Sequence, residues 1–298
     1  MTSAPPATSA MPATPITPAA LLRASPLPPL EARILLTHVL GWRPTQLITR
    51  SDEPLEATSV ERYRALEARR VAGEPVAQLV GAREFFGLDF EVTPDVLIPR
   101  PETELLVDTA LTAMEGVARP RVLDLGTGTG AIAVAIASTR PDSWVLALDR
   151  SAEALALATR NAARLLKQNR PGGPVVLQQS DWYGSLAPSL RFDVIVSNPP
   201  YIASGDPHLA EGDLRFEPRG ALTDEADGLS AIRAIVAGAP AHLAANGVLW
   251  IEHGYDQAVA VRALLTAQGF AQVRSECDLA GIERISGGQL SGEAAQPE

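Results

Sequence analysis

The chain has 298 residues and 25 basic against 35 acidic side chains, so its formal net charge is −10, which disfavours a polybasic nucleic-acid-binding protein. A hydrophobic content of 46% excludes global disorder, and no apolar run reaches the roughly 18 residues that a membrane-spanning helix needs. The single cysteine, Cys277, excludes an intramolecular disulfide and a thiolate zinc cluster. We therefore expect a cytoplasmic protein of about two domains, with no membrane attachment.

Both ends of the chain are expected to be tails. Residues 1–22 carry no charged side chain and consist mostly of Ala, Pro, Thr and Ser, so they cannot bury enough apolar surface to offset the entropy lost on ordering. We predict disorder over residues 1–16 and again over residues 289–298. Prolines interrupt every apolar stretch near the amino terminus, so a secretion signal is not expected.

The segment 17–73 has helical periodicity and no strong strand signal. Thr17 and Pro18 are typical of a helix start, apolar residues recur at helical spacing over 30–39, and another helix fits 59–72. The segment holds eight arginines against six acidic residues. We predict a small helical domain whose slight basicity suits either a solvated surface or recognition of a partner.

Residues 74–100 differ in character from the helical segment. The run from Phe85 to Val92 alternates between apolar and polar residues like a strand, and prolines punctuate the segment. We predict that it forms a hairpin linker.

From residue 101 to residue 288 the pattern alternates between strands and helices, which is typical of an α/β fold with a parallel sheet wound on both faces. The expected strands are 121–125, 144–148, 175–179, 192–197 and 247–252. The expected helices are 102–115, 130–139, 151–167, 229–244 and 255–268. Apolar signals near 270–276 and 282–286 predict a closing antiparallel hairpin and not another parallel unit.

The first chemical motif is a glycine-rich turn that follows the strand at 121–125. Its glycines are Gly126, Gly128 and Gly130, and an acidic residue, Asp124, stands two positions before the first. Glycines there permit positive φ and close approach of a ligand to the backbone. This spacing resembles the S-adenosylmethionine-binding loop of Rossmann-like methyltransferases more than a dinucleotide site, although a tight turn without a ligand is the alternative. Asp149 ends the next strand, where its carboxylate could accept the hydroxyls of a ribose.

The second motif, Asn198-Pro199-Pro200-Tyr201, follows the buried strand at 192–197, at the edge where open parallel sheets place their ligands. The Asn198 side-chain oxygen and the Pro199 carbonyl could accept the two N–H groups of a planar amide or amine. The prolines fix φ and remove competing donors, and Tyr201 could stack on the flat target. A rigid proline turn is the alternative, which the glycine loop in the same sheet disfavours.

Enzymes that methylate DNA bases, RNA bases and glutamine side chains share this second motif, so the flanking residues decide between them. The chain resembles the PrmC/HemK family of glutamine methyltransferases, which act on class-1 peptide chain release factors. The resemblance extends over nearly the whole chain after residue 17, through the glycine loop and through the segments 81–87, 98–104, 198–202 and 215–218. It implies a helical substrate-recognition domain, a hairpin, and a Rossmann-like class I methyltransferase domain with a seven-stranded mixed sheet.

The resemblance also implies roles for individual residues. The cofactor would be S-adenosyl-L-methionine, leaving as S-adenosyl-L-homocysteine. Its binding residues would be Gly126, Thr127, Gly128, Thr129 and Gly130 of the loop, Asp149 at the ribose, Trp182 near the adenine, and Asn198. The catalytic pocket would be formed by Asn198, Pro199, Pro200 and Tyr201. Plain core packing is the alternative for Trp182. The acidic residues of 100–104 begin a helix, and they either belong to the pocket or complement the helix dipole.

The partner implied by the resemblance is a class-1 release factor, bound by a monomer without direct contact to nucleic acid. No metal site and no general base are evident in the sequence. The alternative function is amino-methylation of DNA or RNA bases, which the acidic charge disfavours; a nucleotide-binding module without activity would leave the Asn198 motif without a purpose. The chain itself contains Gly287-Gly288-Gln289, the tripeptide that the family methylates, but we do not expect a terminal strand to reach its own pocket.

Overall fold

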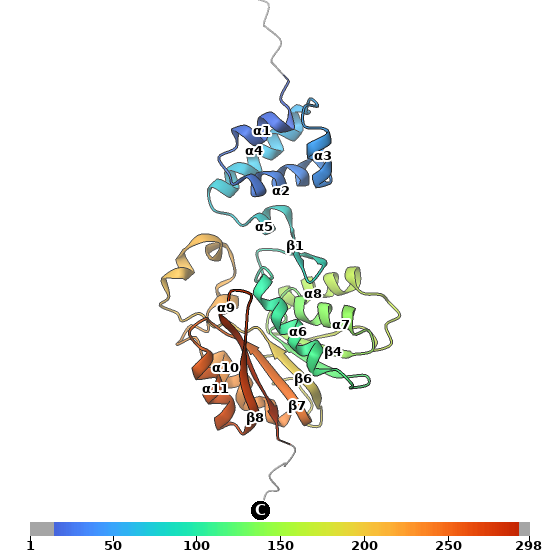
Figure 1. Cartoon of the computed structure of the whole chain (residues 1–298), viewed down its shortest axis with the longest axis vertical. Coiled ribbons are helices and arrows are strands. Elements are labelled where there is room, and N and C mark those ends of the chain that lie inside the picture. Colours follow the sequence, from blue (N-terminus) through green and yellow to red (C-terminus); the bar gives the residue numbers. More distant parts are fainter. Residues whose placement is uncertain (1–14, 292–298) are drawn as a thin grey trace, which may run out of the picture. The chain divides into compact units, whose positions relative to one another are not determined.

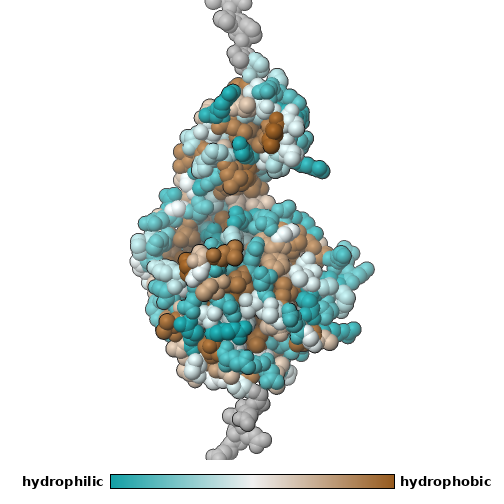
Figure 2. All heavy atoms as spheres, viewed as in Figure 1, coloured by the Kyte–Doolittle hydropathy of each residue, from teal (hydrophilic) through white to brown (hydrophobic). Residues whose placement is uncertain are grey.

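The computed structural model describes residues 15–291 and divides between Val80 and Gly81 into two compact units. Most of both predicted tails, residues 1–14 and 292–298, lies outside the described residues. The first unit is helical and the second is the α/β unit. In residues 15–291 no helix is both long and apolar enough to cross a bilayer. Figure 2 shows hydrophobic residues in separate patches among hydrophilic ones on the face that it draws.

The helical unit packs five helices around one apolar core (Figure 1). They are α1 (Pro18–Ala24), α2 (Pro29–Leu40), α3 (Pro44–Thr49), α4 (Ala57–Val71) and α5 (Val76–Val80). The Thr17 hydroxyl accepts a hydrogen bond from the Ala20 amide, which confirms the predicted helix start. The predicted boundary at residue 73 is wrong, because Leu79 of α5 is buried in the same core as Leu35 and Tyr63.

The α/β unit begins with a hairpin of β1 (Ala82–Phe85) and β2 (Leu88–Glu91). The sequence pattern had predicted a hairpin here, and the chain turns at Phe86 and Gly87, whose φ values of 52° and 73° suit a tight primed turn. Asn161 holds the hairpin in place, since its side chain accepts from the Glu91 amide at 2.8 Å and donates to the Glu91 carbonyl at 3.0 Å. The same amide nitrogen donates to the Thr129 carbonyl at 3.0 Å.

Seven strands form the main sheet, in the order β5-β4-β3-β6-β7-β9-β8. They are β3 (Arg121–Leu125), β4 (Trp144–Asp149), β5 (Val176–Gln179), β6 (Phe192–Ser197), β7 (Leu243–Glu252), β8 (Phe270–Cys277) and β9 (Glu283–Leu290). The strands β3 to β7 run parallel and the β8–β9 hairpin antiparallel, which confirms the predicted mixed sheet. The tail predicted from residue 289 begins too early, because Gln289 and Leu290 pair within β9.

Helices cover both faces of this sheet (Figure 1). One layer is formed by α6 (Glu104–Ala113), α7 (Ala131–Thr139) and α8 (Ala152–Leu165), and the other by α10 (Ser230–Gly238) and α11 (Ala258–Ala267). Short helical turns complete the unit: η1 (Pro101–Thr103), η2 (Pro207–Ala210), η3 (Gly212–Phe216), α9 (Arg219–Leu222) and η4 (Ala239–Ala241). Alternate residues of β3 serve the two layers, since Val122 packs with α6 and α7 while Leu123 and Leu125 pack with α10 and α11.

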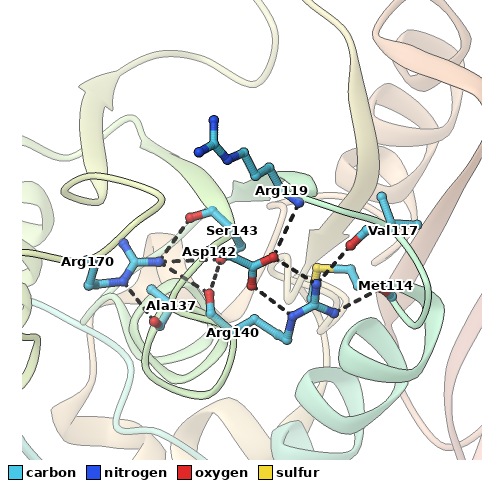
Figure 3. Close-up of polar contacts among 8 residues, drawn as sticks. All are labelled: Met114, Val117, Arg119, Ala137, Arg140, Asp142, Ser143 and Arg170. Carbon is cyan, nitrogen blue, oxygen red and sulfur yellow. Dashed lines mark hydrogen bonds and ion pairs between the residues drawn. The ribbon is translucent and has the colours of Figure 1, made fainter.

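The side chains of two arginines donate hydrogen bonds to backbone carbonyls near the starts of β3 and β4 (Figure 3). Arg140 donates to the carbonyls of Met114 and Val117, both at 2.9 Å. Arg170 is 7% exposed and donates to the carbonyls of Ala137 at 2.8 Å and Ser143 at 3.0 Å. These carbonyls lie at or just after the ends of α6 and α7, where helices leave acceptors without a partner.

Removing the Arg170 guanidinium should therefore destabilise the protein. We expect Arg170→Met, which keeps the apolar stem, to lower the free energy of unfolding by about 2–4 kcal/mol because buried carbonyls lose their donors. Arg119→Met is the matched control, since the Arg119 side chain points away from this cluster in Figure 3. Denaturant titration measures both variants, and equal stability of the two would contradict this role of Arg170.

Candidate active site

The carboxyl ends of four parallel strands place four polar or backbone groups in one row. Leu125, Leu148, Ser197 and Ile251 are register partners across β3, β4, β6 and β7. The residues that follow them are Gly126, Asp149, Asn198 and Glu252. Three predicted features therefore meet at one edge of the sheet: the glycine loop, the ribose acceptor and the Asn198 motif. Glu252, to which no role was assigned from the sequence, lies at the same edge.

The glycine loop needs its glycines for two different reasons. Gly126, Gly128 and Gly130 have φ values of 74°, 55° and 81°, a region that L side chains rarely adopt. A Cβ at Gly126 would lie 3.7 Å from the Trp182 ring, an ordinary contact distance, so it is the positive φ and not crowding that favours glycine there. A Cβ at Gly130 would lie only 3.1 Å from the Ala158 Cβ, so this glycine permits α7 to pack against α8.

Asp149 at the end of β4 holds the loop from its other side. Its Oδ2 accepts from the Gly128 amide and its Oδ1 from the Ser151 amide, each at 2.9 Å. Each carboxylate oxygen has a further lone pair. Asp149 can therefore orient the loop and still accept hydroxyl donors from a ligand.

A cavity of about 410 Å³ opens at this edge, and it is more apolar than polar, as small-molecule sites usually are. Most of the predicted site residues line it: Gly126, Thr127, Gly128, Thr129, Asp149, Trp182, Asn198 and Pro200. Gly130, Pro199 and Tyr201 do not line it. Gly130 begins α7 behind the loop, while Pro199 is buried.

Tyr201 turns into the protein. Its hydroxyl donates to Glu252 Oε1 at 3.3 Å, and its ring packs against the apolar layer formed with α10 and α11. Burial raises the pKa of the Tyr201 phenol well above its ordinary value, so the hydroxyl remains a donor. In this arrangement the ring does not lie in the cavity, contrary to the stacking position that the sequence suggested.

The Asn198 side chain is held by one hydrogen bond. Its Nδ2 donates to the Thr103 hydroxyl at 3.1 Å. Its Oδ1 is buried and has no hydrogen-bond partner among residues 15–291. A buried acceptor without a donor costs about 1–3 kcal/mol, and a donor brought by a ligand would remove that cost.

Two buried acids lie at the same edge. Burial raises the pKa of Asp124 to about 7, although the Thr127 hydroxyl, which donates to its Oδ2 at 2.6 Å, opposes the shift. Burial also raises the pKa of Glu252 to about 7, against hydrogen bonding from Thr103 and Tyr201. Perturbed carboxyl groups of this kind cluster at functional sites. In the described part of the chain, no three His, Cys, Asp or Glu residues are grouped so that they could hold a metal ion.

Sequence reasoning missed the residues that connect distant segments. Glu217 pairs with Arg100, and its Oε2 accepts from the Ile98 amide at 2.9 Å. This contact joins two segments that the sequence had singled out separately, and it brings residues 94–100, predicted to be a linker, into the cavity wall. Burial raises the pKa of Glu217, against the attraction of the Arg100 guanidinium. No local sequence pattern predicts such a pairing.

The tripeptide Gly287-Gly288-Gln289 lies inside β9, away from this edge. Gln289 is the register partner of Val248 in the middle of β7, whereas the site lies at the carboxyl end of that strand. The Gln289 side chain donates to the Asn246 carbonyl at 2.9 Å, and a Cβ at Gly287 would collide with Trp250. The expectation that this tripeptide does not reach the pocket agrees with its place in the sheet.

Comparisons with known proteins cover both units. Residues 19–81 match the PrmC N-terminal domain and residues 101–211 match the methyltransferase small domain. The chain is 70% identical over 278 residues to the release factor glutamine methyltransferase of Burkholderia pseudomallei, covering 93% of this chain and 98% of that protein. It is 56% identical over 270 residues to the protein of the same name in Bordetella pertussis, covering 91% and 98%. A methyltransferase structure from Pyrococcus furiosus, 20% identical with a TM-score of 0.50 over 76% of this chain and 98% of that one, shows the fold alone.

The raised pKa of Asp124 fixes the sign of a pH dependence. The folded protein binds the Asp124 proton with a pKa of about 7, whereas the unfolded chain binds it near an ordinary value of about 4. The neutral carboxyl thus stabilises the fold at low pH, and this stabilisation is lost as pH rises through about 7. We expect Asp124→Asn to lose less stability than the wild type between about pH 4 and about pH 8. Denaturant titrations at several pH values measure this, with the exposed Asp108→Asn as control; identical pH profiles for all three proteins would contradict it.

Proposed function

This chain belongs to the family of release factor glutamine methyltransferases, and on that premise we propose how its own residues perform the reaction. The enzyme transfers the methyl group of S-adenosyl-L-methionine to the side-chain amide nitrogen of the glutamine in the Gly-Gly-Gln motif of class-1 peptide chain release factors. S-adenosyl-L-homocysteine is the second product. The single observation that carries the proposal is the row of strand ends that unites the glycine loop, Asp149 and Asn198 around one cavity.

The residues of the cavity fit this cofactor. The positive φ of Gly126 and Gly128 exposes backbone that a side chain would cover, so a nucleoside can approach the loop. Asp149 accepts from ribose hydroxyls with the lone pairs that the loop leaves free, and Trp182 packs beside the adenine. When bound, the cofactor supplies a methyl group that its sulfonium makes electrophilic.

Asn198 and Pro199 orient the target amide. An amide nitrogen is a poor nucleophile because its lone pair is delocalised, so its alignment with the methyl group carries much of the catalysis, an effect worth up to about 7–11 kcal/mol. We assign one N–H to Asn198 Oδ1, which is buried with no donor among residues 15–291, and the other to the Pro199 carbonyl. Pro199 and Pro200 add no competing N–H donors. After transfer the methylated amide can release its extra proton to water.

The helical unit recognises the protein substrate in this proposal. It carries eight arginines against six acidic residues from position 17 to position 73, and no reactive cluster was found in its sequence. A slightly basic surface suits an acidic region of a release factor. The enzyme acts as a monomer in the cytoplasm, without nucleic acid or membrane; the free, exposed Cys277 suits that reducing compartment.

Transfer of labelled methyl groups from S-adenosyl-L-methionine to purified release factors tests the function directly, with DNA and ribosomal RNA offered as competing substrates. Label in the release factor alone is the expected result. Label in nucleic acid alone would favour the alternative, a methyltransferase of DNA or RNA bases, which the net charge of −10 disfavours.

Two substitutions should separate catalysis from cofactor binding. We expect Asn198→Ala to lower turnover by on the order of a hundredfold or more while cofactor affinity is largely kept, since the lost oxygen aligns the amide. Asp149→Ala should weaken cofactor affinity by about 1.5–3 kcal/mol, since charge-assisted hydrogen bonds are lost. Calorimetry and steady-state kinetics measure the two effects, and near wild-type turnover of Asn198→Ala would remove Asn198 from the mechanism.

The pocket should also reject glutamate in place of the substrate glutamine. A glutamate would set oxygens against Asn198 Oδ1 and the Pro199 carbonyl, and sites built on such hydrogen bonds reject analogues that lack them by about 10⁴ or more. Asparagine keeps the amide but is one methylene too short, so it should fail as well. Methylation of release factors with each residue in the Gly-Gly-Gln motif tests this; a glutamate variant methylated at about a tenth of the normal rate would refute the amide-reading pocket.

A further inference from the structure

The Asn198 side chain is hydrogen-bonded to a second residue of the cavity wall, Thr103. Asn198 Nδ2 donates to the Thr103 hydroxyl at 3.1 Å. Glu252 Oε1 accepts from Tyr201 at 3.3 Å, and its Oε2 is buried with no hydrogen-bond partner among residues 15–291. Thr103 of η1 and Asn198, which follows β6, thus form a hydrogen-bonded pair.

The chemistry of these groups sets the direction of their hydrogen bonds. A threonine hydroxyl oxygen accepts hydrogen bonds, and of the two ends of an amide only the nitrogen donates. The observed contact therefore runs from Asn198 Nδ2 to the Thr103 oxygen. The Asn198 amide is therefore turned with its nitrogen toward Thr103 and its oxygen away. With the opposite orientation, the amide would present N–H groups to a substrate that also presents N–H groups.

The position of Thr103 argues against a purely local role. Thr103 occupies the N-cap position of α6, where a threonine usually accepts from the first turn of its helix. Here its side chain makes no such capping bond. Thr103 is nevertheless only 4% exposed at the cavity wall, and its hydroxyl oxygen accepts from Asn198 Nδ2.

We propose that Thr103 is a positioning residue that turns the Asn198 amide so that its oxygen accepts from the target amide. Thr103 acts only through Asn198 and touches no reacting atom. This inference rests on the proposed function, because it gives Asn198 Oδ1 the task described above. The segment of residues 100–104 then contributes to catalysis by orienting the side chain of Asn198, which follows β6.

Thr103→Val tests the inference, because valine keeps the shape of threonine and removes the hydroxyl. We expect kcat for release-factor methylation to fall by about 10- to 100-fold, with the KM for cofactor changed by no more than about threefold, since a misdirected amide affects alignment more than cofactor binding. Thr103→Ser restores the hydroxyl and should restore most of the rate. Thr112→Val makes the same change on the exposed side of α6 and should leave the rate as in the wild type.

A double-mutant cycle shows whether Thr103 acts through Asn198. In the Asn198→Ala background, Thr103→Val should cost less than about twofold in kcat, because no amide remains to be turned. An equal loss in both backgrounds, or a serine variant as slow as the valine variant, would overturn the inference. Cofactor binding by calorimetry shows that each variant is folded.

The two hypotheses fail in different ways. If the wild-type protein transfers no label to a release factor, the proposed function fails. If the wild type methylates the release factor and Asn198→Ala is slow while Thr103→Val is normal, only the inference about Thr103 fails.

Discussion

The register of four parallel strands is the constraint on which the site depends. Because Leu125, Leu148, Ser197 and Ile251 are paired in one line, the next residue of each strand emerges at the same edge. Each of these emerging residues then differs in chemistry: a glycine that bares the backbone, a carboxylate, an amide and a buried acid. A slip of one residue in any strand would turn that strand's side chains to the opposite face and remove its group from the row.

This register is held by packing on both faces and by polar contacts at the opposite edge. Alternate residues of each central strand lie in separate apolar layers. A slip of one residue would therefore move each of these side chains to the layer on the opposite face of the sheet. Arg140 and Arg170 bind loop carbonyls at the far edge and fix where β3 and β4 begin. The functional edge can therefore consist of loops, because the rigid sheet beneath determines where each loop starts.

Local patterns predicted the fold and much of the candidate site, and they failed where a contact joins distant segments. Buried strands followed by glycine or proline turns are visible in the sequence, so the sheet and both motifs were found. The pairing of Glu217 with Arg100 joins residues more than a hundred positions apart, and nothing in either segment specifies its partner. Glu252 also ends a strand, but its burial and its hydrogen bond with Tyr201 arise only in the folded structure, so no role could be assigned to it from local patterns.

Asn161 couples the stability of the glycine loop to that of the β1–β2 hairpin. Its buried amide bonds the β1–β2 hairpin at Glu91 and the glycine loop at Thr129 with the same nitrogen. Displacement of either segment would leave a buried N–H of Asn161 without its acceptor, which couples local unfolding of the two. Amide protection gained at the loop when a ligand binds is then shared by a hairpin nearly forty residues earlier in the chain.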